Sequence, residues 1–151
     1  MNKLQENVLL SYPRSGNHLC RFFIELLHEL PTYGCKNNKE DIEIYKNIFD
    51  EHIPFNIQKI FEKKECYFKY HIPPPNNINT KKLILIVRNP REVLLRTCGE
   101  TLNINNNWVS YESYFNNIDF YNNYKGNKLL LYYEDIITNK TEFINTLYDF
   151  L

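Results

Sequence analysis

Residues 7–30, NVLLSYPRSGNHLCRFFIELLHEL, decide how this chain folds. The first six residues form a short apolar run typical of a β-strand, and the breakers Pro13 and Gly16 follow it. Beyond them, apolar residues recur at helical spacing, at Leu19, Phe22, Phe23, Leu26, Leu27 and Leu30. The stretch therefore predicts a strand, a tight loop and a helix.

The loop between this strand and helix is a candidate anion site. The first turn of a helix has N–H groups without intrahelical acceptors, and the helix dipole makes that end electropositive. Arg14 and Ser15 add a cation and a hydroxyl. The loop lacks the second glycine and the lysine of the nucleoside triphosphate loop, Gly, four residues, then Gly-Lys-Ser/Thr. A polar turn without a ligand is the alternative interpretation.

The composition indicates one globular domain spanning residues 1–151, because 43% of the residues are hydrophobic. Lys and Arg number 18, as do Asp and Glu, so no basic field points to nucleic acid as a partner. The four cysteines form no C-x-x-C pair, which predicts buried thiols and no metal site. No signal segment and no apolar run of about 20 residues occurs, so we expect a cytoplasmic protein without a membrane span.

Short helices are expected near residues 40–49 and 55–63, followed by an aromatic strand at residues 66–71. The three prolines at residues 73–75 stop that strand, because proline cannot donate to the ladder. Lys69 and His71 are two residues apart, so they lie on one side of the strand at its end. Ligands bind at strand ends in open α/β sheets. A lone histidine is nevertheless more often a structural residue.

Residues 83–87 form a continuous apolar run of the kind buried in parallel sheets. Asn89 then has the position of a helix N-cap, with Pro90 first in the helix and Glu92 third, which predicts a capping box. Arg88 emerges where the strand ends.

Arg88, Arg91 and Arg96 suggest a second anion site on this strand and helix, since arginine suits bidentate capture of phosphate. The alternative is that these arginines pair with nearby acids such as Glu92 and Glu100.

Further elements are expected as a helix at residues 108–124, a strand at 129–133 followed by two acidic residues, and a helix at 141–151. Strands that alternate with helices predict an α/β fold, a three-layer sandwich with a central parallel sheet.

Four stretches occur in the order characteristic of one family: SYPRSGNH at residues 11–18, FKYHIP at 68–73, LILIVRNPREVLLR at 83–96 and LLLYYEDI at 129–136. Together they resemble the sulfotransferases that use 3′-phosphoadenosine 5′-phosphosulfate (PAPS). The corresponding family segments are YPKSGTTW, KTHLP, the 3′-phosphate strand and helix, and a strand ending in YED. The resemblance covers residues 8–151 and implies a P-loop NTPase-like sandwich.

The resemblance implies transfer of a sulfuryl group from PAPS to a hydroxyl or amine acceptor, releasing adenosine 3′,5′-bisphosphate without a metal. His71 would be the general base, suited by an ordinary pKa near 6.5, and Lys69 would lie beside it. Arg14 would stabilise the leaving phosphate. The other implied donor-binding residues are Ser15, Gly16, Asn17 and His18 at the 5′-phosphosulfate, Arg88 at the 3′-phosphate with Arg96 in place of a serine, and Tyr133 near the adenine.

The chain also departs from the family pattern. Leu19 replaces a tryptophan that stacks on adenine, and a later Arg-Lys-Gly segment has no counterpart, which suggests a short or C-terminally truncated member. The acceptor, whether a small molecule, glycan, lipid or peptide, would bind residues 31–64 and 101–124. Homo-oligomerisation stays open. The alternative functions are a small P-loop-type kinase and a non-catalytic nucleotide-binding or interaction domain left by truncation.

Overall fold

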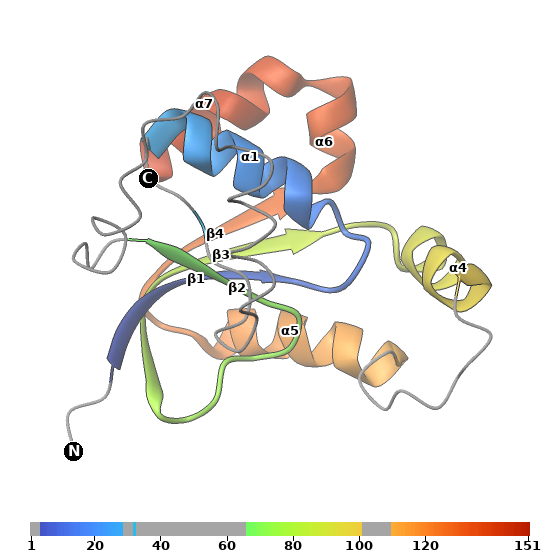
Figure 1. The fold of residues 1–151 in the computed structure, drawn as a ribbon, viewed down its shortest axis with the longest axis horizontal. Helices are drawn as coiled ribbons and strands as arrows, with labels where there is room; N and C mark the ends of the chain where they lie inside the picture. The colour runs from blue at the N-terminus through green and yellow to red at the C-terminus, as the bar shows by residue number, and fades with distance from the viewer. Residues whose placement is uncertain (1–3, 29–31, 33–65, 101–109) are drawn as a thin grey trace, which may run out of the picture.

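A four-stranded parallel sheet forms the centre of the protein (Figure 1). The computed structural model describes residues 4–28, 32, 66–100 and 110–151, so the helices expected near residues 40–49 and 55–63 lie outside the described residues. The strands stand in the order β2-β1-β3-β4, and each neighbouring pair is parallel. Their bounds are Leu4–Ser11 for β1, Tyr67–Tyr70 for β2, Ile78–Val87 for β3 and Asn127–Tyr132 for β4. The prediction of an α/β fold with a parallel sheet is confirmed.

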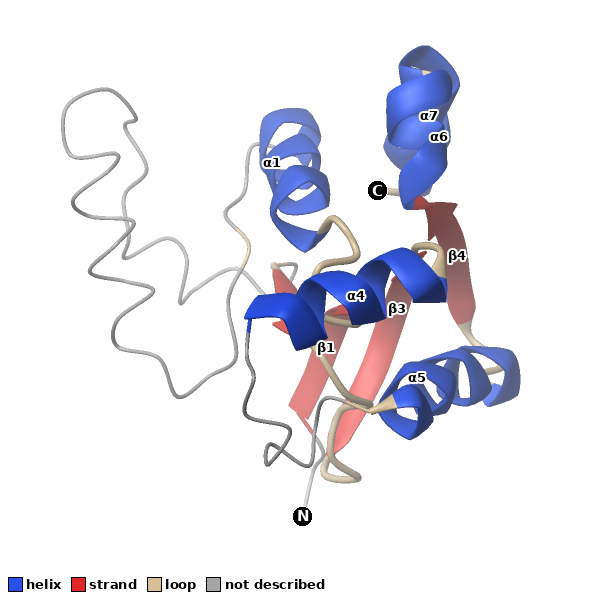
Figure 2. Ribbon diagram, turned by 90° about the vertical axis from the view of Figure 1, so that its right-hand side faces the viewer, coloured by secondary structure: helices blue, strands red, loops and turns tan. Residues whose placement is uncertain are grey.

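Helices cover both faces of the sheet (Figures 1 and 2). Helices α1, α6 and α7 lie on one face, α5 lies on the other, and α4 lies beyond the end of β3. Their bounds are Asn17–His28 for α1, Pro90–Glu100 for α4, Tyr111–Asn123 for α5, Tyr133–Thr138 for α6 and Lys140–Phe150 for α7. Each helix in the described ranges is too short or too polar to cross a bilayer.

The alternating side chains of β3 supply both layers of the core. Ile84 and Ile86 pack on the side of α1 and α7, whereas Leu83 and Leu85 pack on the side of α5. All four are at most 1% exposed. Burial on both faces explains why the strand is apolar at every position from residue 83 to residue 87, because a strand with one solvated face would alternate.

Two elements differ from the prediction. Strand β3 begins at Ile78, five residues before the apolar run, because its first half pairs with Leu4, Gln5 and Glu6 of β1 while its side chains alternate in exposure. Helix α6 was not predicted, and its first residue, Tyr133, was expected at the end of the strand at residues 129–133. The helix has six residues and starts directly after β4 with no side-chain cap, so no boundary signal announces it.

The capping prediction for α4 is half right. Asn89 Oδ1 accepts a hydrogen bond from Arg91 N at 3.0 Å, and Pro90 is the first residue of the helix. The prediction of the second capping-box bond, from the Asn89 amide to the Glu92 side chain, is wrong. The Asn89 amide donates instead to Glu134 Oε1, at 2.9 Å. The N-terminus of α4 is thereby joined to α6.

Candidate functional site

The site is built at the edge of the sheet where the parallel strands end. β1 lies between β2 and β3, and the register places Leu10 beside Tyr70 and Ser11 beside Ile86. The loop that follows β1 is therefore flanked by the ends of both neighbouring strands. Open parallel sheets bind ligands at this position.

The loop at residues 12–16 has an unusual backbone. Arg14 has φ +65° and Gly16 has φ +92°, and the Ser15 amide donates to Tyr12 O at 3.2 Å. A non-glycine residue with positive φ is uncommon and is found where the surroundings impose it. The first helical hydrogen bond runs from Cys20 N to Gly16 O, so the amides of the preceding turn lie at the open end of α1.

Two polar side chains are buried inside this loop. Ser15 is 0% exposed and its Oγ has no hydrogen-bond partner among the described residues. The Asn17 amide is bonded to Ser11 Oγ at 2.6 Å, while its other polar atom is buried without a described partner. Because a hydroxyl can donate as well as accept, either amide orientation keeps the bond to Ser11, and one of them turns an NH₂ group toward the unsatisfied side. A buried polar atom without a hydrogen-bond partner lowers the stability of the protein. A bound anion would give partners to Ser15 Oγ and to the unpaired polar atom of Asn17, so their burial here fits an anion-binding loop.

His71 reaches the loop from the end of β2. Its Nδ1 lies 2.8 Å from Ser11 O. A carbonyl oxygen only accepts, so Nδ1 carries the proton of the neutral ring and Nε2 is its basic nitrogen.

The expectation of an ordinary pKa for His71 is wrong. Burial lowers the pKa of His71 to about 4, with the charges of Lys69, His18 and Arg21 acting in the same direction and the bond to Ser11 opposing them. The ring is therefore neutral at pH 7. Two residues predicted for the site, Lys69 and His18, are thus close enough to act electrostatically on His71.

Arg88 reaches the same loop from the end of β3. Its Nη1 donates to Arg14 O at 3.2 Å, and its Cζ lies 4.1 Å from the centre of the Tyr133 ring. Tyr133 in turn packs on Gly16, where a Cβ atom would overlap Tyr133 Cδ2 and lie 2.9 Å from Cε2. Four of the predicted site residues, from three segments of the chain, thus form one cluster.

Arg96 has a different environment. Its Nε lies 3.7 Å from Glu92 Oε2, and both side chains are more than half exposed. This pair matches the alternative interpretation, in which an arginine of this helix pairs with a nearby acid. Its role at a 3′-phosphate stays a prediction.

Arg21 and Asn117 were not singled out in the sequence, and Tyr114 was expected only as a core or acceptor-pocket aromatic. Arg21 is 4% exposed on α1 and donates to Thr32 Oγ1 at 2.6 Å and to Thr32 O at 3.0 Å. Tyr114 and Asn117 of α5 hydrogen-bond to the backbone of Arg88 and His71. A signal existed for Arg21, because it is the one cation among the apolar positions of its helix. No signal pointed to the bonds that Tyr114 and Asn117 make, since their partners are 26 and 46 residues away.

The chemistry of this arrangement is anion binding next to a neutral imidazole. The loop and the start of α1 bring together backbone amides, the buried Ser15 hydroxyl and the cation Arg14, and Arg88 is bonded to the loop. Lys69 acts electrostatically on His71, which can accept a proton at Nε2. Within the described residues, no three His, Cys, Asp or Glu side chains are grouped so that they could hold a metal ion. The chain matches no family model, and no curated protein sequence matches it either.

Proposed function

We propose that this chain is a PAPS-dependent sulfotransferase domain of P-loop-like architecture. The observation that carries the proposal is the convergence of two strand ends on one helix-opening loop. His71, after β2, contacts Ser11 O at the end of β1 where the loop begins, and Arg88, after β3, contacts the loop at Arg14 O. A donor with a 5′-phosphosulfate and a 3′-phosphate requires several anion-binding groups beside a proton acceptor, and the loop, Arg88 and His71 together would meet that requirement.

The residues in the loop fit the phosphosulfate end of the donor. Ser15 Oγ and one polar atom of Asn17 have no hydrogen-bond partner among the described residues, and the amides at the start of α1 would add donors for an anion. Arg14 would stabilise the charge that develops on the leaving phosphate oxygen. Arg88 would bind the 3′-phosphate, and the Tyr133 ring would lie near the adenine with one face already occupied by Arg88.

Bound PAPS supplies the sulfuryl group, whose S–O bond to the 5′-phosphate breaks as the acceptor oxygen bonds to sulfur. His71 Nε2 would take the acceptor proton as that oxygen attacks. The pKa of about 4 makes His71 a weak base in the empty site. An anion at the loop would offset the positive charges of Lys69, His18 and Arg21, and would therefore raise the pKa of His71 toward the working pH.

Binding is tested by calorimetry with adenosine 3′,5′-bisphosphate on the wild-type chain and on Ser15→Ala. Because the Ser15 hydroxyl has no described partner, its removal should leave the free energy of unfolding unchanged or raise it by up to about 1 kcal/mol. The same change should weaken binding about 10- to 100-fold, since a hydrogen bond to a charged group contributes about 1.5–3 kcal/mol. Ser113→Ala is the matched control, because Ser113 is also a buried serine and its hydroxyl contacts Ser110.

Turnover is tested by sulfuryl transfer from PAPS to a panel of hydroxyl and amine acceptors, with His71→Ala as the variant. Loss of transfer with retained bisphosphate binding supports His71 as the base. Tight binding without transfer in the wild-type chain favours the non-catalytic alternative. Magnesium-dependent ATP turnover with no response to PAPS would replace the proposal with the kinase alternative.

A further inference from the structure

Helix α5 touches all three segments of the site, although none of the motif residues lies on it. It packs on the opposite face of the sheet from α1, with its first turns beneath the strand ends (Figures 1 and 2). The contacts come from Tyr114 and Asn117, one turn apart on the same side of the helix.

Asn117 holds the backbone at the end of β2. Its Nδ2 donates to His71 O at 3.0 Å, and the side chain is 2% exposed. Its Oδ1 is buried with no hydrogen-bond partner among the described residues. A buried amide that uses half of its hydrogen-bonding capacity costs more than an apolar side chain would at this position. The bond to His71 is therefore the feature that accounts for an asparagine here.

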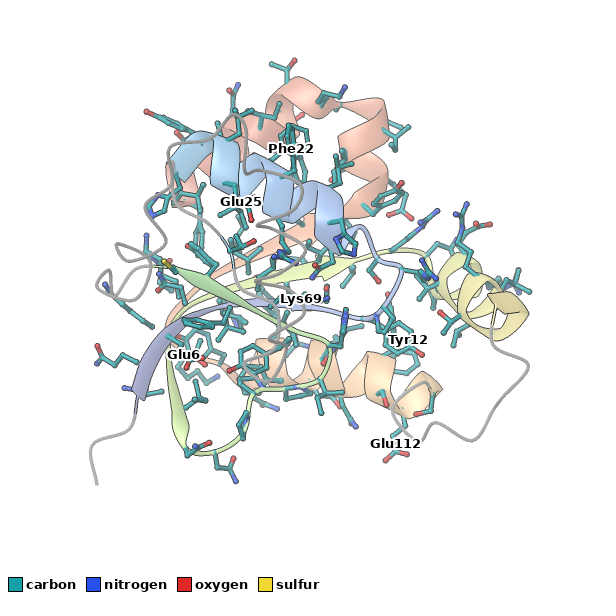
Figure 3. All side chains as sticks on the ribbon, in the orientation of Figure 1. Glu6, Tyr12, Phe22, Glu25, Lys69 and Glu112 are labelled. Carbon is teal, nitrogen blue, oxygen red and sulfur yellow. The ribbon has the colours of Figure 1, made fainter. Side chains whose placement is uncertain are left out.

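Tyr114 holds the backbone at the end of β3 and also the start of the loop. Its hydroxyl donates to Arg88 O at 2.8 Å. Its ring packs edge-on against Tyr12, with 5.7 Å between the ring centres. Figure 3 shows Tyr12 between the loop and α5. Tyr12 and Tyr114 are 1% and 6% exposed, so this contact is part of the core.

We propose that α5 sets the geometry of the site, with Asn117 positioning His71 and Tyr114 positioning Arg88 relative to the loop. The proposal rests on the proposed function, because it assigns His71 to proton transfer and Arg88 to donor binding. His71 is then held at two points, its ring by Ser11 O and its backbone by Asn117. Arg88 is likewise held at both ends, its side chain by Arg14 O and Tyr133 and its backbone by Tyr114.

A structural role alone would give a different pattern of effects, and α5 contains the control that distinguishes the two. The Tyr124 hydroxyl, at the other end of this helix, donates to Thr80 O at 2.9 Å. Tyr114→Phe and Tyr124→Phe therefore each remove a tyrosine hydroxyl that bonds a backbone carbonyl in or next to β3, one from the first turn of α5 and one from its C-cap. Only Tyr114 is bonded at the strand end that forms the site.

We expect the two Tyr→Phe variants to lose similar stability in urea. Tyr114→Phe should also weaken binding of adenosine 3′,5′-bisphosphate about three- to tenfold, whereas Tyr124→Phe should leave it unchanged. Equal affinities of the two variants would overturn the assignment of Tyr114.

Asn117→Leu should act on transfer and not on binding. We expect kcat to fall about 10- to 100-fold with the KM for PAPS within twofold of wild type, because a small displacement of a catalytic group is costly. A parallel rise in KM, or an unchanged kcat, would overturn the role of Asn117.

A readout that needs no activity separates this inference from the proposed function. The His71 ring is followed by ¹H–¹⁵N NMR through a pH titration of wild type, Asn117→Leu and Tyr124→Phe. In Asn117→Leu we expect the ring signals to shift and the pKa of His71 to rise toward its ordinary value, since the ring becomes more solvated while Lys69, His18 and Arg21 still face it. Unchanged signals would refute the positioning role. If the wild-type chain binds no bisphosphate but Asn117→Leu still changes the pKa of His71, the proposed function is refuted and the positioning role of Asn117 stands.

Discussion

Replacing Gly16 by alanine tests the packing that joins the loop to α6. The new Cβ would lie 2.9 Å from Tyr133 Cε2 and overlap Cδ2, whereas ordinary contacts are 3.4–4 Å. Tyr133 would have to move away from Arg88, whose Cζ is 4.1 Å from the ring centre. The perturbation therefore reaches from the loop to the end of β3.

The magnitude follows from three contributions. Positive φ costs an alanine about 1–2 kcal/mol. Loss of the stacking between Arg88 and Tyr133 adds about 0.5–1 kcal/mol. Alanine also restricts the unfolded chain more than glycine does, which stabilises the folded state by about 0.4–1 kcal/mol and offsets part of these two losses. We expect Gly16→Ala to lower the free energy of unfolding by about 1–2 kcal/mol, which corresponds to a Tm lower by about 2–8 °C.

Urea unfolding of Gly16→Ala, Tyr133→Ala and the double variant measures the coupling between the two residues. We expect a coupling of at least about 0.5 kcal/mol, because the overlap disappears when the ring is absent. Gly126→Ala is the control for an overlap away from the site, since its Cβ would overlap the hydroxyl and Cζ of Tyr124 and would not touch Tyr133. Additive effects, or a Gly16→Ala variant as stable as wild type, would refute this reasoning.

Three further predictions concern pH, a helix end and an exposed arginine. The pKa of His71 is about 4 in the folded chain and near 6.5 in the unfolded chain, so the unfolded chain binds more protons between these pH values. The free energy of unfolding should therefore fall as the pH drops from 6.5 to 4, and urea unfolding of His71→Asn should show a smaller fall. Lys82→Met should cost about 1 kcal/mol in urea unfolding with unchanged bisphosphate affinity, because Lys82 Nζ donates to Phe150 O at 3.1 Å and Leu151 O at 2.7 Å. Arg96→Met should change stability by less than about 0.5 kcal/mol, since the pair with Glu92 is exposed, and calorimetry with the bisphosphate tests whether Arg96 has the predicted phosphate role.

Much of the fold was predictable because the decisive signals are local. The apolar runs around Leu9 and Leu85 specify buried strands, and a strand buried on both faces needs a helix on each side. The first half of β3 could not be predicted in this way, because its alternating polar residues become a strand only by pairing with β1. Helix α6 has no cap or periodic pattern long enough to be recognised.

In the candidate site, too, some features follow from the local sequence and others depend on contacts between distant segments. The sequence by itself determined the loop, its cation Arg14 and the positions of His71 and Arg88 at strand ends, because each follows from its immediate neighbours in the chain. Only the tertiary structure decided the protonation state of His71, which depends on burial and on charges from other segments. It also decided that Glu134 replaces Glu92 at the Asn89 amide, and that α5 holds the backbone behind the site. Hydrogen bonds and desolvation between distant segments leave no periodic trace in a sequence, so they emerge only when the chain is folded.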